Sequence, residues 1–262
     1  MFKTIAFELL NFFLIVIKKL SMFKKLSKLD LDNSKLRQDG VESMGKLLTK
    51  KQCQDLRSRI DALIDNPNVK VWRDPEGSDE RIFFADKVDL AFKELYESKI
   101  IRDKLVSYTG TREPVGMLLA AKLSPLKNNL GSGGGWHRDS PFRTQFKSLC
   151  YLNNVTEVGG PFQIIKGSHK MISVIVASLK SLLKLGEYRF SEKTIKSYIN
   201  TTNHFSSDIL GSEGDFFAVD TKAIHRGKPI LEGTRYVLFW YFWDGELPAH
   251  IAALSQDSTI DD

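Results

Sequence analysis

The chain has 262 residues and a mass of 29.8 kDa, a length that suits one substantial core better than two. Hydrophobic residues make up 42% and charged residues 27%, which excludes a disordered composition and indicates a folded globular domain. The net charge of +6 permits an anionic partner, but much of the excess comes from lysines near the N-terminus: Lys18, Lys19, Lys24, Lys25 and Lys28. No basic motif interleaved with aromatic residues is present, so we do not expect nucleic acid as a partner.

The two cysteines, Cys53 and Cys150, lie far apart and form no CxxC motif. This excludes a disulfide framework and a cysteine-based zinc site. The pattern fits a reducing compartment, and we expect a cytoplasmic protein.

The first 28 residues contain an apolar run, 5–17 (IAFELLNFFLIVI), that is shorter than the roughly 20 residues of a membrane-spanning helix. Lys18 and Lys19 follow it directly and no small-residue cleavage site is present, so a cleaved signal is not expected. Polar residues recur at helical intervals, which predicts an amphipathic helix within residues 1–28. Two interpretations stay open: packing on this domain or a partner chain, the commoner case, or peripheral contact with an anionic membrane.

Residues 29–110 are predicted to form a helical support region. Thr49 and the glutamine three residues later fit a capping box, and apolar residues at helical spacing follow, so we expect a helix over 49–65. A second helical stretch is expected over 89–108, with a break near Ser98.

From residue 111 onward the pattern changes to short apolar or alternating runs separated by turn residues. Short strands at this spacing indicate a mainly β fold, an antiparallel barrel or jelly roll. The predicted core covers residues 111–250, with a helical insertion at about 171–200 and a C-terminal tail over 251–262. The expected strands are 115–123, 147–155, 162–165, 215–219 and 235–243.

A His-x-Asp motif, His137-Arg138-Asp139, places an imidazole and a carboxylate on one face of an extended segment, with Arg138 turned away. His225, in the segment AIHRGKP, supplies the third ligand of a 2-His-1-carboxylate triad, which leaves iron coordination positions open. Ten residues after His225, Arg235 opens an apolar strand. Its planar guanidinium matches a carboxylate, so it is the expected partner for the far end of a dicarboxylate.

Residues from about 115 to 243 resemble the phytanoyl-CoA dioxygenase family of Fe(II)/2-oxoglutarate-dependent oxygenases. The stretches that carry the resemblance are GGWHRDSPF, YLNNVTEVGGPFQIIKGSHK, GDFFAVDTKAIHRGKP and TRYVLFWYF. The resemblance implies a double-stranded β-helix (cupin-like jelly roll) that uses Fe(II), 2-oxoglutarate and O2. It also implies that His137, Asp139 and His225 ligate iron and that Arg235 binds the C5 carboxylate of 2-oxoglutarate, with Lys122 in LLAAKLSP as a further co-substrate residue.

The reaction implied by the resemblance is hydroxylation of an unactivated C–H bond, with release of succinate and CO2. Related halogenases have Gly or Ala at the position of Asp139, so a carboxylate there favours hydroxylation. The family often has Gln at the position of Arg138 and Asn-Gly-Pro at 159–161, where this chain has Gly-Gly-Pro. These departures bear on substrate preference, and a small-molecule, sugar-linked or lipid substrate stays open.

Three other functions share parts of this pattern. A non-catalytic jelly-roll module that binds a ligand would share the fold, because fold alone does not fix function. A structural zinc protein fits poorly, because the ligand set is mixed and contains no cysteine. A kinase is excluded, since His137-Arg138-Asp139 is followed by Thr144 where a metal-binding Asn is needed.

Expectations also follow for the glycine-rich stretch, the other histidines, the lysines of the insertion and three aromatic residues. The glycine-rich stretch 131–135 lacks the GK[ST] ending of a phosphate loop and is expected to lead into the metal site. The other histidines, His169, His204 and His250, are expected in a turn or in solvent. Lysines 166, 170, 180 and 184 would suit an anionic ligand if they faced the pocket, although solvated lysines are commoner. The aromatic side chains of Trp136, Phe142 and Trp240 suit either pocket walls or core.

Overall fold

A computed structural model describes residues 5–6, 9–10, 13, 34–111, 114–139, 145–180, 183 and 187–257. Of the N-terminal segment, the five described residues are helical, whereas the lysines between 18 and 28 lie outside the described residues. Membrane contact through residues 1–28 therefore stays a prediction. Within the described ranges, no helix is long and apolar enough to cross a membrane.

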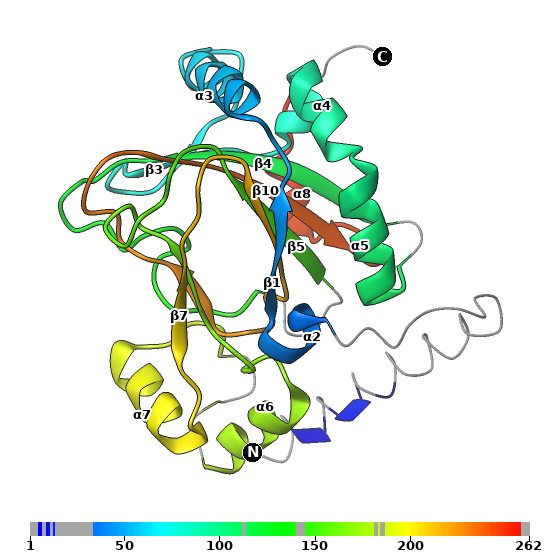
Figure 1. The fold of residues 1–262 in the computed structure, drawn as a ribbon, viewed down its shortest axis with the longest axis vertical. Coiled ribbons are helices and arrows are strands. Elements are labelled where there is room, and N and C mark those ends of the chain that lie inside the picture. Colours follow the sequence, from blue (N-terminus) through cyan, green and yellow to red (C-terminus); the bar gives the residue numbers. More distant parts are fainter. Residues whose placement is uncertain are drawn as a thin grey trace.

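Two antiparallel sheets form the core of the fold (Figure 1). The large sheet contains, in spatial order, β1 (Val41–Lys46), β8 (Asp215–Val219), β5 (Gln145–Tyr151), β10 (Arg235–Trp243), β4 (Val115–Leu123), β3 (Asp79–Ile82) and β2 (Trp72–Arg73). The small sheet contains β7 (Ser206–Ile209), β6 (Phe162–Ile165) and β9 (His225–Gly227). This is the mainly β, double-stranded β-helix architecture that the sequence predicted.

Helices cover the outer face of each sheet. Figure 1 shows α3, α4 and α5 beside the large sheet and α6 and α7 near the small one. The helices are α2 (Lys35–Asp39), α3 (Lys50–Ile64), α4 (Leu90–Tyr96), α5 (Lys99–Thr109), α6 (Met171–Leu179), α7 (Glu192–Thr202) and α8 (Ala249–Ala252), with a 3₁₀ turn η1 (Ala85–Lys87).

Side chains of the large sheet alternate between two cores. Along β10, Val237 and Phe239 pack between the sheets, whereas Leu238, Trp240 and Phe242 pack under the helices. This follows from the two-residue period of a strand. The same alternation in β4 and β5 decides which polar side chains of these strands reach the space between the sheets.

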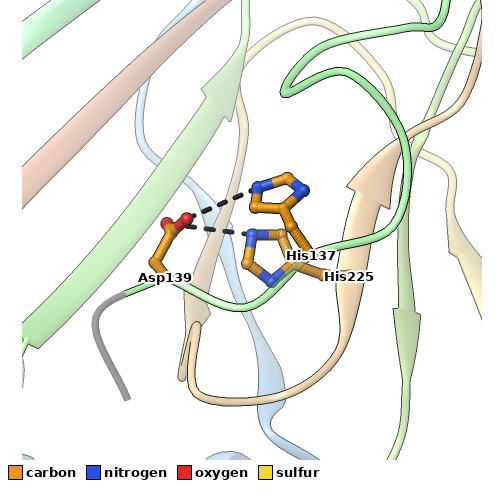
Figure 2. Close-up of side chains that lie close together, drawn as sticks. All are labelled: His137, Asp139 and His225. Atoms are coloured by element: carbon orange, nitrogen blue, oxygen red, sulfur yellow. Dashed lines mark ion pairs between the residues drawn. The ribbon is translucent and has the colours of Figure 1, made fainter. Parts of the chain in front are cut away.

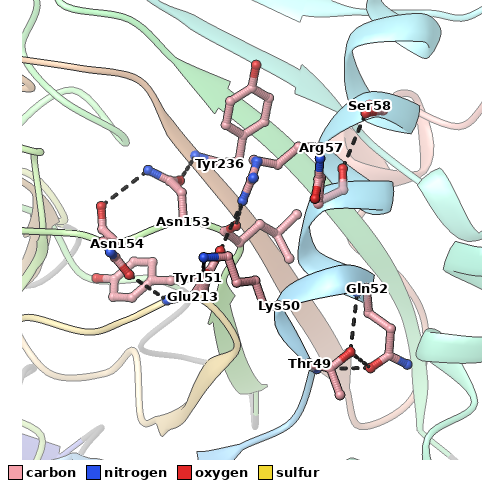
Figure 3. A network of polar contacts seen from close by, with 12 residues as sticks. Thr49, Lys50, Gln52, Arg57, Ser58, Tyr151, Asn153, Asn154, Glu213 and Tyr236 are labelled. Atoms are coloured by element: carbon pink, nitrogen blue, oxygen red, sulfur yellow. Dashed lines mark hydrogen bonds and ion pairs between the residues drawn. The ribbon is translucent and has the colours of Figure 1, made fainter.

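The N-terminal half of helix α3 has a complete cap and polar contacts to two neighbouring loops (Figure 3). In the capping box, the Thr49 side chain accepts from the Gln52 backbone, and Gln52 Oε1 accepts from the Thr49 N–H at 2.9 Å. About two turns after the cap, Arg57 donates to the Leu152 carbonyl and lies 3.5 Å from a Glu213 carboxylate oxygen. The contacts of Arg57 attach α3 to the loops after β5 and before β8.

The predicted elements are largely confirmed. Strands β4, β6, β8 and β10 have the predicted bounds, and α3 follows its Thr49 cap. The break near Ser98 is confirmed, since α4 ends at Tyr96 and α5 begins at Lys99. Both cysteines are free and buried in the helix-side core.

Several expectations need correction. Strand β5 begins at Gln145 and ends at Tyr151, so the predicted end at residue 155 was too late. The helical insertion at about 171–200 contains two helices, α6 and α7, and among the described residues between them Arg189 forms a β-bridge with His137. The region 29–110 is not only helical, because β1, β2 and β3 from it extend the large sheet.

Candidate metal centre and adjoining cavities

Three side chains from two distant segments of the chain converge between the two sheets: His137 and Asp139 from one segment and His225 from the other (Figure 2). Backbone hydrogen bonds bring them together. The N–H of His137 donates to the His225 carbonyl and the N–H of His225 donates to the His137 carbonyl, both at 2.9 Å. The N–H of Asp139 donates to the Thr221 carbonyl at 2.9 Å. Arg138 points away from the cluster, as predicted, and its Nε donates to the Lys222 carbonyl.

The spacing of the donor atoms suits one metal ion. His137 Nε2 lies 3.4 Å from Asp139 Oδ1, His225 Nε2 lies 3.8 Å from Oδ2, and one ligand atom from each residue lies within 4.8 Å of the others. Two ligands of one metal, each bonded at about 2.1 Å, can be at most about 4.2 Å apart. Both carboxylate–imidazole distances satisfy this limit.

Both imidazoles are oriented by backbone carbonyls. Nδ1 of His137 lies 2.8 Å from the Gly135 oxygen, and Nδ1 of His225 lies 2.9 Å from the Ala223 oxygen. Because a carbonyl only accepts, each Nδ1 carries the proton and each Nε2 presents its lone pair to the cluster. In metal-binding histidines generally, a hydrogen bond from the ring nitrogen that does not bind the metal fixes the orientation of the ring. His225 Nε2 is buried without a hydrogen-bond partner.

The electrostatic environment keeps His225 and Asp139 in the protonation states that metal binding needs. Burial, reinforced by His137, lowers the pKa of His225 to about 3, so the imidazole is neutral at pH 7. Burial alone would raise the pKa of Asp139, but Lys147 and the two histidines outweigh it and hold that pKa well below its ordinary value. The cluster therefore offers a neutral imidazole at His225 and an ionised carboxylate at Asp139.

A cavity of about 170 Å³, the inner cavity, adjoins the cluster. Arg235 is 2% exposed, lines this cavity, and has a buried Nε without a hydrogen-bond partner. Within the described part of the chain, no carboxylate forms an ion pair with it. A buried guanidinium in this state is ready to bind an anion, because an unpaired buried charge is costly. The other lining residues are Arg81, Ser132, Gly133, His137, Asp139, Lys147, Tyr151, Phe162, Arg189, His225, Gly227, Phe239 and Tyr241.

Three cations of the inner cavity were not predicted from the sequence: Lys147, Arg81 and Arg189, the last of which donates to the Gly133 carbonyl. Lys147 is buried on β5, with Nζ 3.4 Å from Asp139 Oδ2 and over the rings of Phe239 and Tyr241. Arg81 pairs through two nitrogens with Asp79. The available signal for Lys147 was its place in a strand segment, between Phe146 and the apolar residues 149–152, since a lysine is rarely buried there without a partner.

Lys122 does not join the cluster. Its Nζ pairs with Asp61 of α3 at 2.7 Å and lies 5.6 Å from the centroid of the Tyr236 ring. Lys122 and Tyr236 are register partners on the helix side of the sheet, opposite to Arg235. The structure brings four of the five predicted site residues together and leaves Lys122 outside.

A second, more open cavity of about 760 Å³, the outer cavity, also adjoins the cluster, and it shares five residues with the inner one: Arg81, His137, Asp139, Arg189 and Tyr241. Its walls are largely aromatic and aliphatic. Besides the shared residues, they comprise Trp72, Phe83, Met117, Arg138, Gln145, Tyr188, Trp243, Pro248, Ala249, His250, Ile251 and Leu254. The predicted C-terminal tail thus contributes to this cavity.

The other singled-out histidines lie apart from the cluster. His169 lies in a turn, as expected, with Nε2 3.1 Å from the Arg37 oxygen. His204 is not solvated as expected, because it is half-buried and stacks on Tyr198. His250 is exposed at the outer cavity.

The candidate aromatic walls and the lysines of the insertion are also placed. Trp136 and Trp240 belong to the hydrophobic cores, and Phe142 lies outside the described residues. Lys166 pairs with Asp39 at 3.7 Å. Lys184 lies outside the described residues, and neither cavity is lined by lysines 166, 170 or 180.

Comparison with known proteins supports the fold. No protein-family model and no curated protein sequence matches the chain. Among solved structures, it is similar to the epimerase SnoN from nogalamycin biosynthesis, in complex with Fe3+, alpha ketoglutarate and nogalamycin RO, with 15% identity over 87% of this chain and 90% of that one and a TM-score of 0.63.

Two further structures show the same likeness. The non-heme alpha ketoglutarate dependent carbocyclase SnoK matches with 13% identity over 87% of this chain and 91% of that one, at a TM-score of 0.60. EctD from S. alaskensis with bound Fe matches with 14% identity over 88% of each chain, at a TM-score of 0.62. At these identities the likeness establishes the fold. The chain is thus a double-stranded β-helix protein with a His-Asp-His cluster suited to a divalent metal.

The glycine loop before His137 gives a test of the cluster's geometry. A Cβ on Gly133 would lie 2.3 Å from His137 Cε1, whereas a Cβ on Gly135 would meet nothing within 4 Å. Both glycines have positive φ, so both alanine variants carry the same kind of backbone strain. We expect Gly133→Ala to weaken Co(II) binding at least tenfold, measured by calorimetry, because His137 must move. Gly135→Ala should bind Co(II) nearly as the wild type does, and equal losses in the two variants would contradict this account.

Proposed function

We propose that the protein is a non-haem Fe(II)/2-oxoglutarate-dependent dioxygenase related to the phytanoyl-CoA dioxygenase family. In this proposal His137, Asp139 and His225 hold Fe(II), and Arg235 binds the C5 carboxylate of 2-oxoglutarate. One observation carries it: the three donors and the unpaired guanidinium of Arg235 line the same buried cavity. The enzyme hydroxylates a C–H bond of a small-molecule, sugar-linked or lipid substrate.

The donor set supports iron over structural zinc. Two imidazoles and one carboxylate on one side of a metal leave its remaining positions open, as in the facial triad of non-haem iron oxygenases. Structural zinc sites are usually closed and rich in cysteine. Here both cysteines lie in the helix-side core, away from the cluster.

The inner cavity supports a small dicarboxylate as the co-substrate. Its volume of about 170 Å³ suits a compact metabolite, and Arg235 offers a buried cation for one carboxylate. The other end of the co-substrate would lie at the metal cluster, which lines the same cavity. The structure of SnoN, which has this fold, contains iron and alpha ketoglutarate.

When bound, Fe(II) together with 2-oxoglutarate reduces dioxygen and oxidises the substrate, with release of succinate and CO2. The protein's own residues bind and orient the reactants. Arg235 sets the direction of the co-substrate, and the Phe162 ring, 5.2 Å from the His225 ring centroid, helps to exclude water from the buried ligand. Asp139 occupies the position that a halide would need, which favours hydroxylation over halogenation.

The test is anaerobic addition of Fe(II) and 2-oxoglutarate to the purified protein. We expect the weak visible charge-transfer band of an Fe(II)–2-oxoglutarate chelate in the wild type and its loss in His225→Ala, since that variant loses one of three protein ligands. Succinate release would then be followed with candidate substrates. Absence of the band in folded wild-type protein would contradict the proposal and favour a non-catalytic ligand-binding module.

A second prediction distinguishes the role of Arg235 in 2-oxoglutarate binding from that of Lys122. Arg235→Met should weaken 2-oxoglutarate binding by about 100-fold, because the variant lacks the charged partner of a buried carboxylate. Co(II) binding should change little, since Arg235 is not a metal ligand in this proposal. Lys122→Met removes a cation on the opposite face of the same sheet and should leave both affinities within about twofold of the wild type. Calorimetric titrations measure all four values, and equal effects of the two substitutions on 2-oxoglutarate binding would refute the assignment of Arg235.

A further inference from the structure

The deep wall of the outer cavity contains two buried polar atoms without hydrogen-bond partners. They are Oε1 of Gln145 and Nε1 of Trp243. Gln145 is 5% exposed and Trp243 is 3% exposed, so neither atom is satisfied by open solvent. Buried polar groups nearly always have hydrogen-bond partners. A donor and an acceptor that both lack a partner in one cavity wall therefore indicate that a bound ligand supplies the missing hydrogen bonds.

The two side chains are neighbours in the sheet. Gln145 of β5 and Trp243 of β10 are register partners, and both belong to the face that is turned toward the small sheet. Directly opposite residues of an antiparallel pair have Cβ atoms about 5 Å apart. One small group can therefore contact both side chains.

The position of this pair along β10 separates it from the co-substrate residues. Arg235 opens the strand and Trp243 ends it, so at about 3.3 Å per residue the two are about 26 Å apart. Between them, on the same face, Phe239 and Tyr241 line the inner cavity beside the metal cluster. The co-substrate would lie toward Arg235, and the other reactant toward Trp243.

The C-terminal segment covers the outer cavity and is held in place by hydrogen bonds. Ile251 and Leu254 line it, and the segment is held by the buried amide of Gln256. Gln256 accepts from the Lys70 N–H at 2.9 Å and donates to the Phe83 carbonyl at 2.7 Å. The roof of the cavity is thereby attached to the segments that flank β2 and β3.

The donor and acceptor properties of the two atoms indicate which ligand group would form hydrogen bonds with both. An indole N–H only donates and an amide oxygen only accepts, so a hydroxyl group satisfies both at once, accepting from Trp243 and donating to Gln145. Met117, which lines the same wall, carries no charge, and the guanidinium of Arg81 is engaged with Asp79. The deep wall thus suits an uncharged hydroxyl on a largely apolar body.

We propose that Gln145 and Trp243 are substrate-recognition residues, and that the substrate is a largely apolar molecule that presents a hydroxyl group to them. This inference rests on the proposed function, because it assigns the outer cavity to the substrate of that site.

The experiment compares an alcohol with its methyl ether. The probes are trans-decahydro-2-naphthol and its methyl ether, which can accept from Trp243 but cannot donate to Gln145. Binding to the full-length protein, with Zn(II) as a diamagnetic metal and 2-oxoglutarate present, is measured by ligand-observed NMR. We expect the wild type to bind the alcohol about fivefold more tightly than the ether, as one hydrogen bond provides.

Three variants assign the preference to residues. Gln145→Met should reduce the alcohol-to-ether ratio to about one, and Trp243→Phe should weaken alcohol binding several-fold. Trp240→Phe is the matched control: it makes the same substitution on the same strand, at a buried indole on the opposite face that lines neither cavity and whose Nε1 donates to the Leu95 carbonyl, and it should leave alcohol binding unchanged. Circular dichroism and thermal unfolding check that each variant is folded.

Failure to bind the alcohol, equal wild-type affinities for alcohol and ether, or equal effects of Trp243→Phe and Trp240→Phe would overturn the inference. The charge-transfer band with Fe(II) and 2-oxoglutarate is recorded on the same wild-type preparation. Its loss contradicts the proposed function, whereas its presence together with equal probe affinities contradicts only the assignment of the outer cavity.

Discussion

The reciprocal backbone hydrogen bonds between His137 and His225 hold the candidate site together. They join a loop that precedes β5 to the first residue of β9, and so bring two segments from distant parts of the chain into register. The side chains that leave this bridge have their Nδ1 atoms occupied by neighbouring carbonyls, so both Nε2 atoms are available to one metal. Without the bridge, neither the orientation of the imidazoles nor their closeness to Asp139 would follow from the local sequence.

Strand alternation then decides the chemistry of the space around the cluster. On β10, the face that carries Arg235 and Tyr241 looks toward the small sheet, and the face that carries Tyr236 looks toward α3. The inner cavity gathers positive charge, with Arg235 unpaired and Lys147 beside Asp139. This distribution is unfavourable in an empty cavity and becomes favourable when a metal-bound dianion is present, because desolvated charges need close partners.

Much of this site could be predicted from the sequence, because its ligands lie in motifs whose spacing has a physical meaning. His137-Arg138-Asp139 places two donors on one face of an extended segment, and Arg235 opens a strand that is apolar throughout its length. The position of Lys122 could not be predicted in this way. Lys122 lies on the same face of β4 as the helix-side residues Leu118 and Ala120, and only the sheet register shows which face that is.

The features that the sequence did not predict depend on long-range pairing. Strand β9 has three residues and pairs with β6, and β2 has two, so neither has a periodicity of its own. The role of Gln145 was hidden for the same reason, because its partner Trp243 is defined only by the pairing of β5 with β10. Local patterns thus predict the elements and the ligands, whereas the sheet register determines which polar side chains share a cavity.

The most direct test of the central claim is a crystal structure of the protein grown anaerobically with Fe(II) and 2-oxoglutarate, with anomalous data collected at the iron edge. The account predicts one iron peak within bonding distance of Nε2 of His137, a carboxylate oxygen of Asp139 and Nε2 of His225. It also predicts the distal carboxylate of 2-oxoglutarate on the guanidinium of Arg235. An iron peak elsewhere, or a co-substrate whose carboxylates both lie away from Arg235, would contradict it.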